Sequence, residues 1–216
     1  MRKCRTLLTL VAVCFAGCAT VKTSTIAFYK PEFRPAGTIA VIAFDPKVRE
    51  SLEWAQYKPK FEASLRSVGY EIVDPRIANQ IAFVAYGIDN GQTETVSIPL
   101  MGQTGGGTSF TSGTIYSDYG SSTFNATTYT MPQYGVVGMI PRSVRTYNRS
   151  IAVNFVDGVS LLKNEPITLM ELRTKSTGTC GEISEVIDEM LEATFKDFPP
   201  KNGKQVTRSI SGQFDC

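Results

Sequence analysis

The sequence has 216 residues, of which 22 are Lys or Arg and 20 are Asp or Glu, so the formal net charge is only +2. This near-neutral balance, without a clustered run of basic residues, argues against a nucleic-acid-binding protein. The chain has no histidine, which excludes Ser-His-Asp and Cys-His catalysis within it and removes the commonest transition-metal ligand.

Residues 1–17 have the organisation of a secretory signal peptide. A positive head precedes an almost wholly apolar run from Leu7 to Ala16, which is the typical order of such signals. This run is too short to cross a bilayer core of about 30 Å as a helix. The positive head consists of three residues, Arg2, Lys3 and Arg5.

The end of this signal, Ala16-Gly17-Cys18, resembles the bacterial lipobox, in which the cysteine is lipidated and becomes the first residue. We therefore predict palmitate-type lipid attachment at Cys18 and an outer-membrane location on the periplasmic face, since Ala19 is not the aspartate associated with inner-membrane retention. The alternative is an ordinary signal peptide cut after Ala16 or Gly17, with Cys18 incidental. Cleavage before Cys18 leaves 19 basic and 20 acidic residues, a net charge of −1, so the lipid must provide the membrane attachment.

The mature chain is long enough for one domain with a core. We expect a lipidated tether over 18–36, with a possible edge strand over 25–29, and then an α+β domain over 37–200. Apolar β-branched runs predict strands, and apolar spacings of three and four predict helices. The expected fold is a mixed sheet with two helices packed on one of its faces. The strands are expected over 38–44, 70–73, 81–87, 150–157 and 167–174, and the helices over 50–68 and 182–197. Pro59 predicts a break or kink in the first helix.

Residues 95–141 differ from their surroundings, because these 47 residues include eight glycines and a single charge, Asp118. We interpret the segment as an insertion, with a hairpin turning near Asp118–Gly120. A surface loop or extra hairpin is favoured. The alternative is a hairpin that enters the outer membrane, as in secretion channels of the curli-exporter type. Segments 115–117 and 123–129 place polar residues on both faces, which disfavours membrane-spanning strands.

Two cysteines remain after Cys4 and Cys14 leave with the signal and Cys18 takes the lipid. Cys180 precedes the last helix and Cys216 ends the chain. In an oxidising compartment we predict a disulfide between them, which would tie the tail over 201–216 to the domain. The alternatives are two free thiols or pairing with another chain.

No set of residues predicts a catalytic, cofactor-binding or metal site. Gly105–Gly107 lacks the lysine of a phosphate-binding loop and is interpreted as part of the insertion. Trp54 and Tyr57 are expected to be core residues rather than an exposed aromatic contact. Acidic residues on the last helix are interpreted as a solvated face rather than a metal or acid–base cluster; they are Glu182, Glu185, Asp188, Glu189 and Glu192.

The order of these parts resembles the bacterial lipoprotein family DUF4136, a domain of unknown function. The residues that carry the resemblance are 61–73 (FEASLRSVGYEIV), 81–88 (IAFVAYGI), the insertion ending in YGVVG at 134–138, the strand 150–157 and the closing 190–200 (MLEATFKDFPP). The resemblance implies an α/β sandwich in the cell envelope and brings no catalytic residues.

These observations lead us to expect a non-enzymatic lipoprotein that binds or scaffolds an envelope protein or polymer, without nucleic acid or cofactors. Two alternatives remain: a subunit of an outer-membrane export pore, and a carboxylate-based envelope hydrolase with two inward carboxylates in a cleft.

Overall fold

The computed structural model describes residues 19–212 and 216, which form two compact units. The first unit contains the chain up to Gln92 and again from Thr146, and the second is Thr93–Arg145. The strands are β1 (Ala19–Tyr29), β2 (Gly37–Ala43), β3 (Tyr70–Ile72), β4 (Gln80–Ile88), β5 (Gln92–Ser117), β6 (Gly120–Asp157), β7 (Thr168–Gly178) and β8 (Val206–Gly212). The helices are η1 (Val48–Glu50), α1 (Leu52–Ser67), α2 (Gly158–Leu162) and α3 (Ile187–Phe195).

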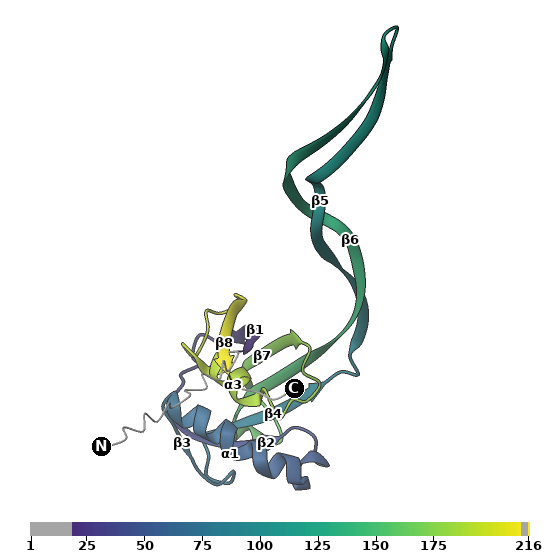
Figure 1. Cartoon of the computed structure of the whole chain (residues 1–216). Helices are drawn as coiled ribbons and strands as arrows, with labels where there is room; N and C mark the ends of the chain where they lie inside the picture. The colour runs from purple at the N-terminus through teal and green to yellow at the C-terminus, as the bar shows by residue number, and fades with distance from the viewer. Residues whose placement is uncertain (1–18, 213–215) are drawn as a thin grey trace, which may run out of the picture. The chain divides into compact units, whose positions relative to one another are not determined.

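The sheet is mixed, as predicted, and the fold is α+β (Figure 1). Its strand order is β3-β2-β4-β6-β7-β1-β8, and β5 pairs with β6. The pairs of β2 with β3 and with β4 are parallel, whereas β4–β6, β6–β7, β7–β1 and β1–β8 are antiparallel. The five expected strands are therefore present; four have boundaries shifted by a few residues, and the one expected over 150–157 is part of the longer β6.

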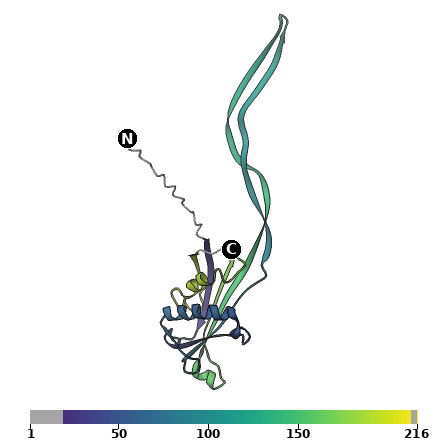
Figure 2. The same ribbon diagram turned by 60° about the horizontal axis from the view of Figure 1, so that its bottom comes forward.

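One main hydrophobic core joins the sheet to α1 and α3, and Figure 2 shows α1 lying across the strands. Alternate residues of the strands supply one side of this core, because successive side chains of a strand point to opposite faces. The buried members include Val41, Val84, Val153 and Leu172 from the strands and Phe61, Leu65, Ile187 and Met190 from the helices. A smaller cluster on the other face includes Ala40, Ala78 and Ile81, with Leu161 of α2 packed against it.

The predicted break at Pro59 is wrong, since α1 is a single helix with Pro59 inside it. Trp54 and Tyr57 before the proline and Phe61 and Leu65 after it are all buried in the same core. This shared packing holds both halves of the helix and offsets the hydrogen bond that proline cannot donate. It also confirms that Trp54 and Tyr57 are core residues.

The last helix is shorter than predicted: α3 covers Ile187–Phe195 rather than 182–197. Ile183 and Val186 are buried before it begins. The Val186 amide donates to the Ile183 carbonyl over 3.2 Å, which forms a turn instead of a helical bond. The helical spacing of apolar residues therefore begins before the helix does, because the turn places Ile183 and Val186 in the same core as α3.

The expected tether over 18–36 is wrong for most of its length. β1 begins at Ala19 and lies between β7 and β8, so it is neither a linker nor an edge strand. Its inward side chains are Val21, Thr23, Thr25 and Ala27. The Thr25 hydroxyl lies 3.0 Å from that of Thr174, which accepts a 2.9 Å hydrogen bond from Thr194. These bonds let a threonine-rich strand be buried.

The second unit contains a hairpin that turns at Asp118–Tyr119, as predicted. β5 has 26 residues and β6 has 38, and Figure 1 shows the two strands twisting around each other. β6 continues into the first unit, where it pairs with β4 and β7. The strand expected over 150–157 is therefore the end of a much longer one.

Candidate functional site

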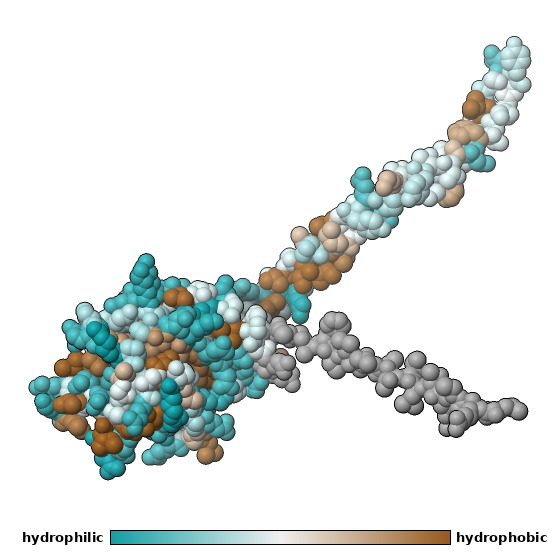
Figure 3. Space-filling view, turned by 90° about the vertical axis from the view of Figure 1, so that its left-hand side faces the viewer, coloured by the Kyte–Doolittle hydropathy of each residue, from teal (hydrophilic) through white to brown (hydrophobic). Residues whose placement is uncertain are grey.

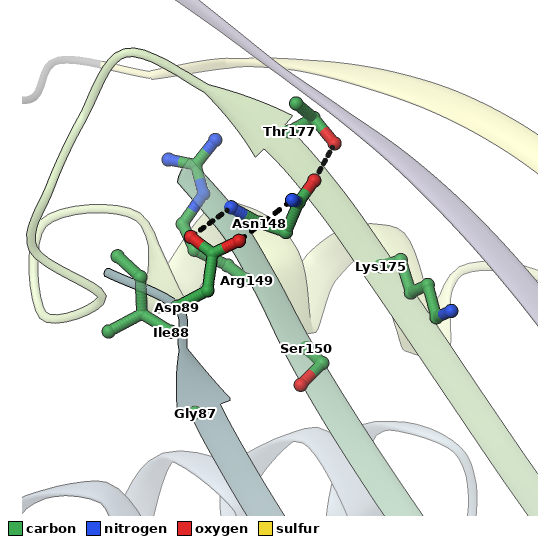
Figure 4. Close-up of a pocket in the computed structure, with 8 residues that line it drawn as sticks. All are labelled: Gly87, Ile88, Asp89, Asn148, Arg149, Ser150, Lys175 and Thr177. Carbon is green, nitrogen blue, oxygen red and sulfur yellow. Dashed lines mark hydrogen bonds between the residues drawn. The ribbon is translucent and has the colours of Figure 1, made fainter. Parts of the chain in front are cut away.

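A polar hollow of about 660 Å³ lies where β4 ends, beside β6 and β7 (Figure 4). Three elements supply its walls, and the pairing register places them together: Asn148 lies opposite Thr177, and Ser150 lies opposite Gly87 and Lys175. The lining residues are Gly87, Ile88, Asp89, Asn148, Arg149, Ser150, Lys175 and Thr177.

Asp89 is the centre of a hydrogen-bonded chain at this hollow. Its Oδ1 accepts from the backbone amides of Asn148 (2.9 Å) and Gly91 (3.0 Å), and its Oδ2 accepts from Asn148 Nδ2 (2.8 Å). Asn148 Oδ1 in turn accepts from the Thr177 hydroxyl over 2.8 Å. This hydrogen-bonded chain ties the end of β4 to β6 and β7.

We expect Asn148→Ala to raise the pKa of Asp89 toward its ordinary value of about 3.9. Hydrogen bonds from the Asn148 backbone and side chain lower the pKa of Asp89 in the folded protein. A lowered folded-state pKa stabilises the fold above the unfolded value, and this stabilisation is lost as the pH falls through the folded value. NMR titration of the Asp89 carboxyl carbon measures the shift. An unchanged pKa in Asn148→Ala would contradict the assignment.

Lys175 and several hydroxyls give the same sheet face a cationic, hydrogen-bonding character. A neighbouring hollow of about 300 Å³ shares Lys175 and Thr177 with the first and adds Lys22, Ser24 and Thr207 among its lining residues. Within residues 19–212 neither lysine has a carboxylate within 4.0 Å. Ammonium and hydroxyl groups arranged in this way suit a carboxylate, a phosphate or a hydroxyl-rich polymer.

Arg149 differs from its neighbours because its side chain is buried, with only 3% exposed. Its Nη2 donates to the Ser176 hydroxyl over 3.2 Å, and its Nε has no hydrogen-bond partner among the described residues. Burial lowers the pKa of this guanidinium. Gly178 makes room for it, because a Cβ there would lie 2.6 Å from Nη2.

A third hollow, of about 270 Å³, brings two carboxylates to one place. Asp45 and Glu53 line it together with Phe44 and Tyr86. Asp45 Oδ1 accepts from the Lys47 backbone amide over 2.9 Å, so this carboxylate closes a local turn.

The residues singled out in the sequence fall in three groups. Cys18 lies outside the described residues. Cys180 and Cys216 are joined, with their Cα atoms 5.2 Å apart, which agrees with the predicted disulfide. Of the acidic residues on the last helix, Asp188 forms a 2.8 Å ion pair with Lys60 of α1. Residues 19–212 contain no group of three or more His, Cys, Asp or Glu side chains placed to hold a metal, and none of their helices is long and apolar enough to cross a membrane.

The polar hollow was not predicted from the sequence. Asp89-Asn90-Gly91 is a recognisable turn signal after a strand, and Lys175 and Thr177 alternate along β7. Neither pattern shows that these residues meet Asn148 and Ser150, because that contact depends on the pairing of β6 with β7.

Comparison with known proteins leaves the family open. No family model matches the chain, and no curated protein matches it. A solved structure that is similar is a PDZ domain protein from Parabacteroides distasonis, with 12% identity and a TM-score of 0.45 over 90% of this chain. The chain spans 40% of that protein's chain. A likeness at this level carries no argument about function, and the resemblance to DUF4136 stays a prediction.

Proposed function

We propose that this protein is an outer-membrane lipoprotein, anchored through a lipid on Cys18, that binds or scaffolds another component of the cell envelope without catalysing a reaction. The observation that carries the anchoring is the order of a positive head, an apolar run and Ala16-Gly17-Cys18. β1 begins directly after this cysteine. The anchored domain would therefore sit close to the bilayer, without an extended linker.

The two adjoining hollows around Lys175 support a binding role. Lys22, Lys175 and the hydroxyls beside them form a face that fits an anionic or hydroxyl-rich envelope polymer, or an acidic surface of an envelope protein. We interpret residues 95–141 as an insertion in a domain of the DUF4136 type. In this proposal the segment serves as a second contact surface for the envelope component.

Cys18→Ser is the direct test of the anchor. We expect the substitution to abolish incorporation of labelled palmitate and to move the protein from the membrane fraction to the soluble periplasmic fraction, because a near-neutral mature chain has no polybasic segment to hold it. Cys14→Ser, within the signal, is the matched control and should leave both readouts unchanged. Palmitate labelling that persists in Cys18→Ser would contradict the proposal.

A second candidate, a subunit of an export pore, is favoured by the 26- and 38-residue strands of the hairpin. Such a subunit would form closed rings of several copies in detergent extracts, which electron microscopy can detect. A single-copy, lipid-anchored particle favours the binding role instead.

A further inference from the structure

The hairpin has an open backbone edge on each of its two sides. Throughout residues 93–145, β5 and β6 pair only with each other. Each strand therefore has one edge whose N–H and C=O groups meet no other strand of the described chain. An unpaired edge of this kind is a template for pairing with a further strand. We call residues 108–117 of β5 and 120–131 of β6, which lie nearest the turn, the distal segment.

The distal segment lacks the side chains that normally keep strand edges apart. Natural edge strands are protected by lysines, other charged residues or prolines. The distal segment has no proline and no charged residue, and the single charge within 95–141 is Asp118, in the turn. The base of the hairpin, in contrast, contains Pro99, Pro132 and Pro141, which cannot donate a backbone hydrogen bond. The edges of the distal segment are therefore the ones left open to a further strand.

The composition of the distal segment favours strand pairing. It contains seven threonines and four aromatic residues, which are among the residues most favoured in strands. Three of the aromatic side chains are exposed over most of their surface: Phe110 (81%), Tyr116 (82%) and Tyr129 (69%). Figure 3 shows mostly residues of intermediate hydropathy in this part of the hairpin. High strand propensity without charge or proline is typical of segments that pair with copies of themselves, and a two-stranded ribbon alone is marginal in water.

The hairpin itself presents the strand that fits these edges. β5 and β6 already pair with each other, and a Cβ added at Gly113 would lie 2.7 Å from the Phe124 ring, so their side chains pack closely across the pair. The free edge of β6 can therefore take a second strand with the sequence and length of β5, which a second copy of the chain supplies. No like charges would face each other across the new pair.

We propose that copies of this chain associate through the distal segment, with β6 of one copy paired antiparallel to β5 of the next. The contact joins two different edges of the hairpin, so it is heterologous and leaves one β5 edge and one β6 edge free at the ends of the assembly. Repetition of such a contact gives a ring where the rotation closes, and a ring has no open edge. The inference goes beyond the proposed binding role and requires neither the lipid on Cys18 nor the polar hollow. It also names the interface that the export-pore candidate would need.

Disulfide cross-linking of the mature Cys18→Ser protein tests this pairing directly. Ser112 and the odd positions of β6 share one face, because Gly113 and Phe124 share the other. Paired strands bring facing Cα atoms within disulfide distance. We expect Ser112→Cys, mixed with at least one of the β6 variants, to form about tenfold more intermolecular disulfide than either protein alone. The β6 variants are Ser121→Cys, Thr123→Cys, Asn125→Cys and Thr127→Cys.

Gln56→Cys, at an exposed position of α1, is the matched control for random collisions. Mixed with the same β6 variants, it should form no more intermolecular disulfide than the single proteins do. Disulfide formation by Ser112→Cys alone, as strong as in the mixtures, would show two β5 edges together and overturn the proposed arrangement. No excess over the Gln56→Cys control at any of the four positions would overturn the proposal.

Sedimentation provides a second measurement that needs no added cysteine. We expect the parent to assemble as its concentration rises, and Thr111→Lys/Thr128→Lys to raise the concentration of half-assembly about tenfold, because charged side chains block strand edges. Ser97→Lys/Ser143→Lys adds the same charge at exposed positions beside Pro99 and Pro141 and should stay within about twofold of the parent. Unchanged circular dichroism shows that the hairpin is retained in both variants.

Pairs and closed rings of the parent would both support the proposal, and rings would in addition favour the export-pore candidate. A parent that stays single-copy at every concentration, or equal effects of the two lysine variants, would contradict it. Because the protein used has no lipid on Cys18, failure of this association leaves the proposed anchor untouched, and loss of palmitate labelling would bear on the anchor alone.

Discussion

Phe155→Ala is expected to lower the free energy of unfolding of the first unit by about 3–5 kcal/mol, the range for removing a buried aromatic ring. Phe155 has no exposed surface. Its ring centroid lies 5.6 Å from that of Phe33, 5.7 Å from that of Phe198 and 6.2 Å from that of Tyr70. The ring therefore packs β6 against Tyr70 of β3 and against Phe33 and Phe198, which lie near the two ends of the domain in the sequence. An alanine would leave a cavity that these elements cannot easily close.

Urea unfolding followed by circular dichroism measures this loss. Phe110→Ala is the matched control, because Phe110 lies in the hairpin with 81% of its surface exposed, and it should change the stability by less than about 0.5 kcal/mol. Total stabilities of domains are about 5–15 kcal/mol, so Phe155→Ala should also reduce the amount of protein in the envelope. Equal effects of the two substitutions would contradict the core assignment.

Cys216→Ser is expected to destabilise the protein by up to about 3–4 kcal/mol, the chain-entropy value for a loop of this length. The disulfide joins residues 36 apart in the sequence. The tail that it closes contains β8, an edge strand that pairs with β1 alone. Without the covalent link β8 should open locally, while the main core under α1 and α3 stays folded.

Limited proteolysis and mass spectrometry can localise this effect. New cleavage in Cys216→Ser should appear within residues 201–216, with the rest of the chain protected. Cys180→Ser and the double variant should match Cys216→Ser, because each removes the same bond. Two alkylatable thiols in the mature, non-reduced Cys18→Ser protein would show that the bond does not form and would contradict the prediction.

The main strands and the first helix could be predicted from the sequence because local pattern and tertiary packing agree there. The β-branched run over 38–44 indicates a strand covered on both faces, and the structure has β2 in the interior of the sheet at Gly37–Ala43. The turn at Asp118–Tyr119 and the pairing of Cys180 with Cys216 were predicted in the same way. In these cases the residues that determine the structure are neighbours in the chain, or are the last two cysteines available.

The burial of β1, the continuity of α1 through Pro59 and the polar hollow were decided only by the tertiary structure. β1 has threonines at inward positions, a pattern typical of an exposed strand, and it is buried because Thr25 finds a hydroxyl partner in Thr174, which is 149 residues away. Pro59 is accepted within α1 because residues on both sides of it reach one core. The polar hollow exists because β4, β6 and β7 bring Asp89, Asn148 and Lys175 together. Each depends on contacts between residues distant in sequence, and local spacing contains no information about such contacts.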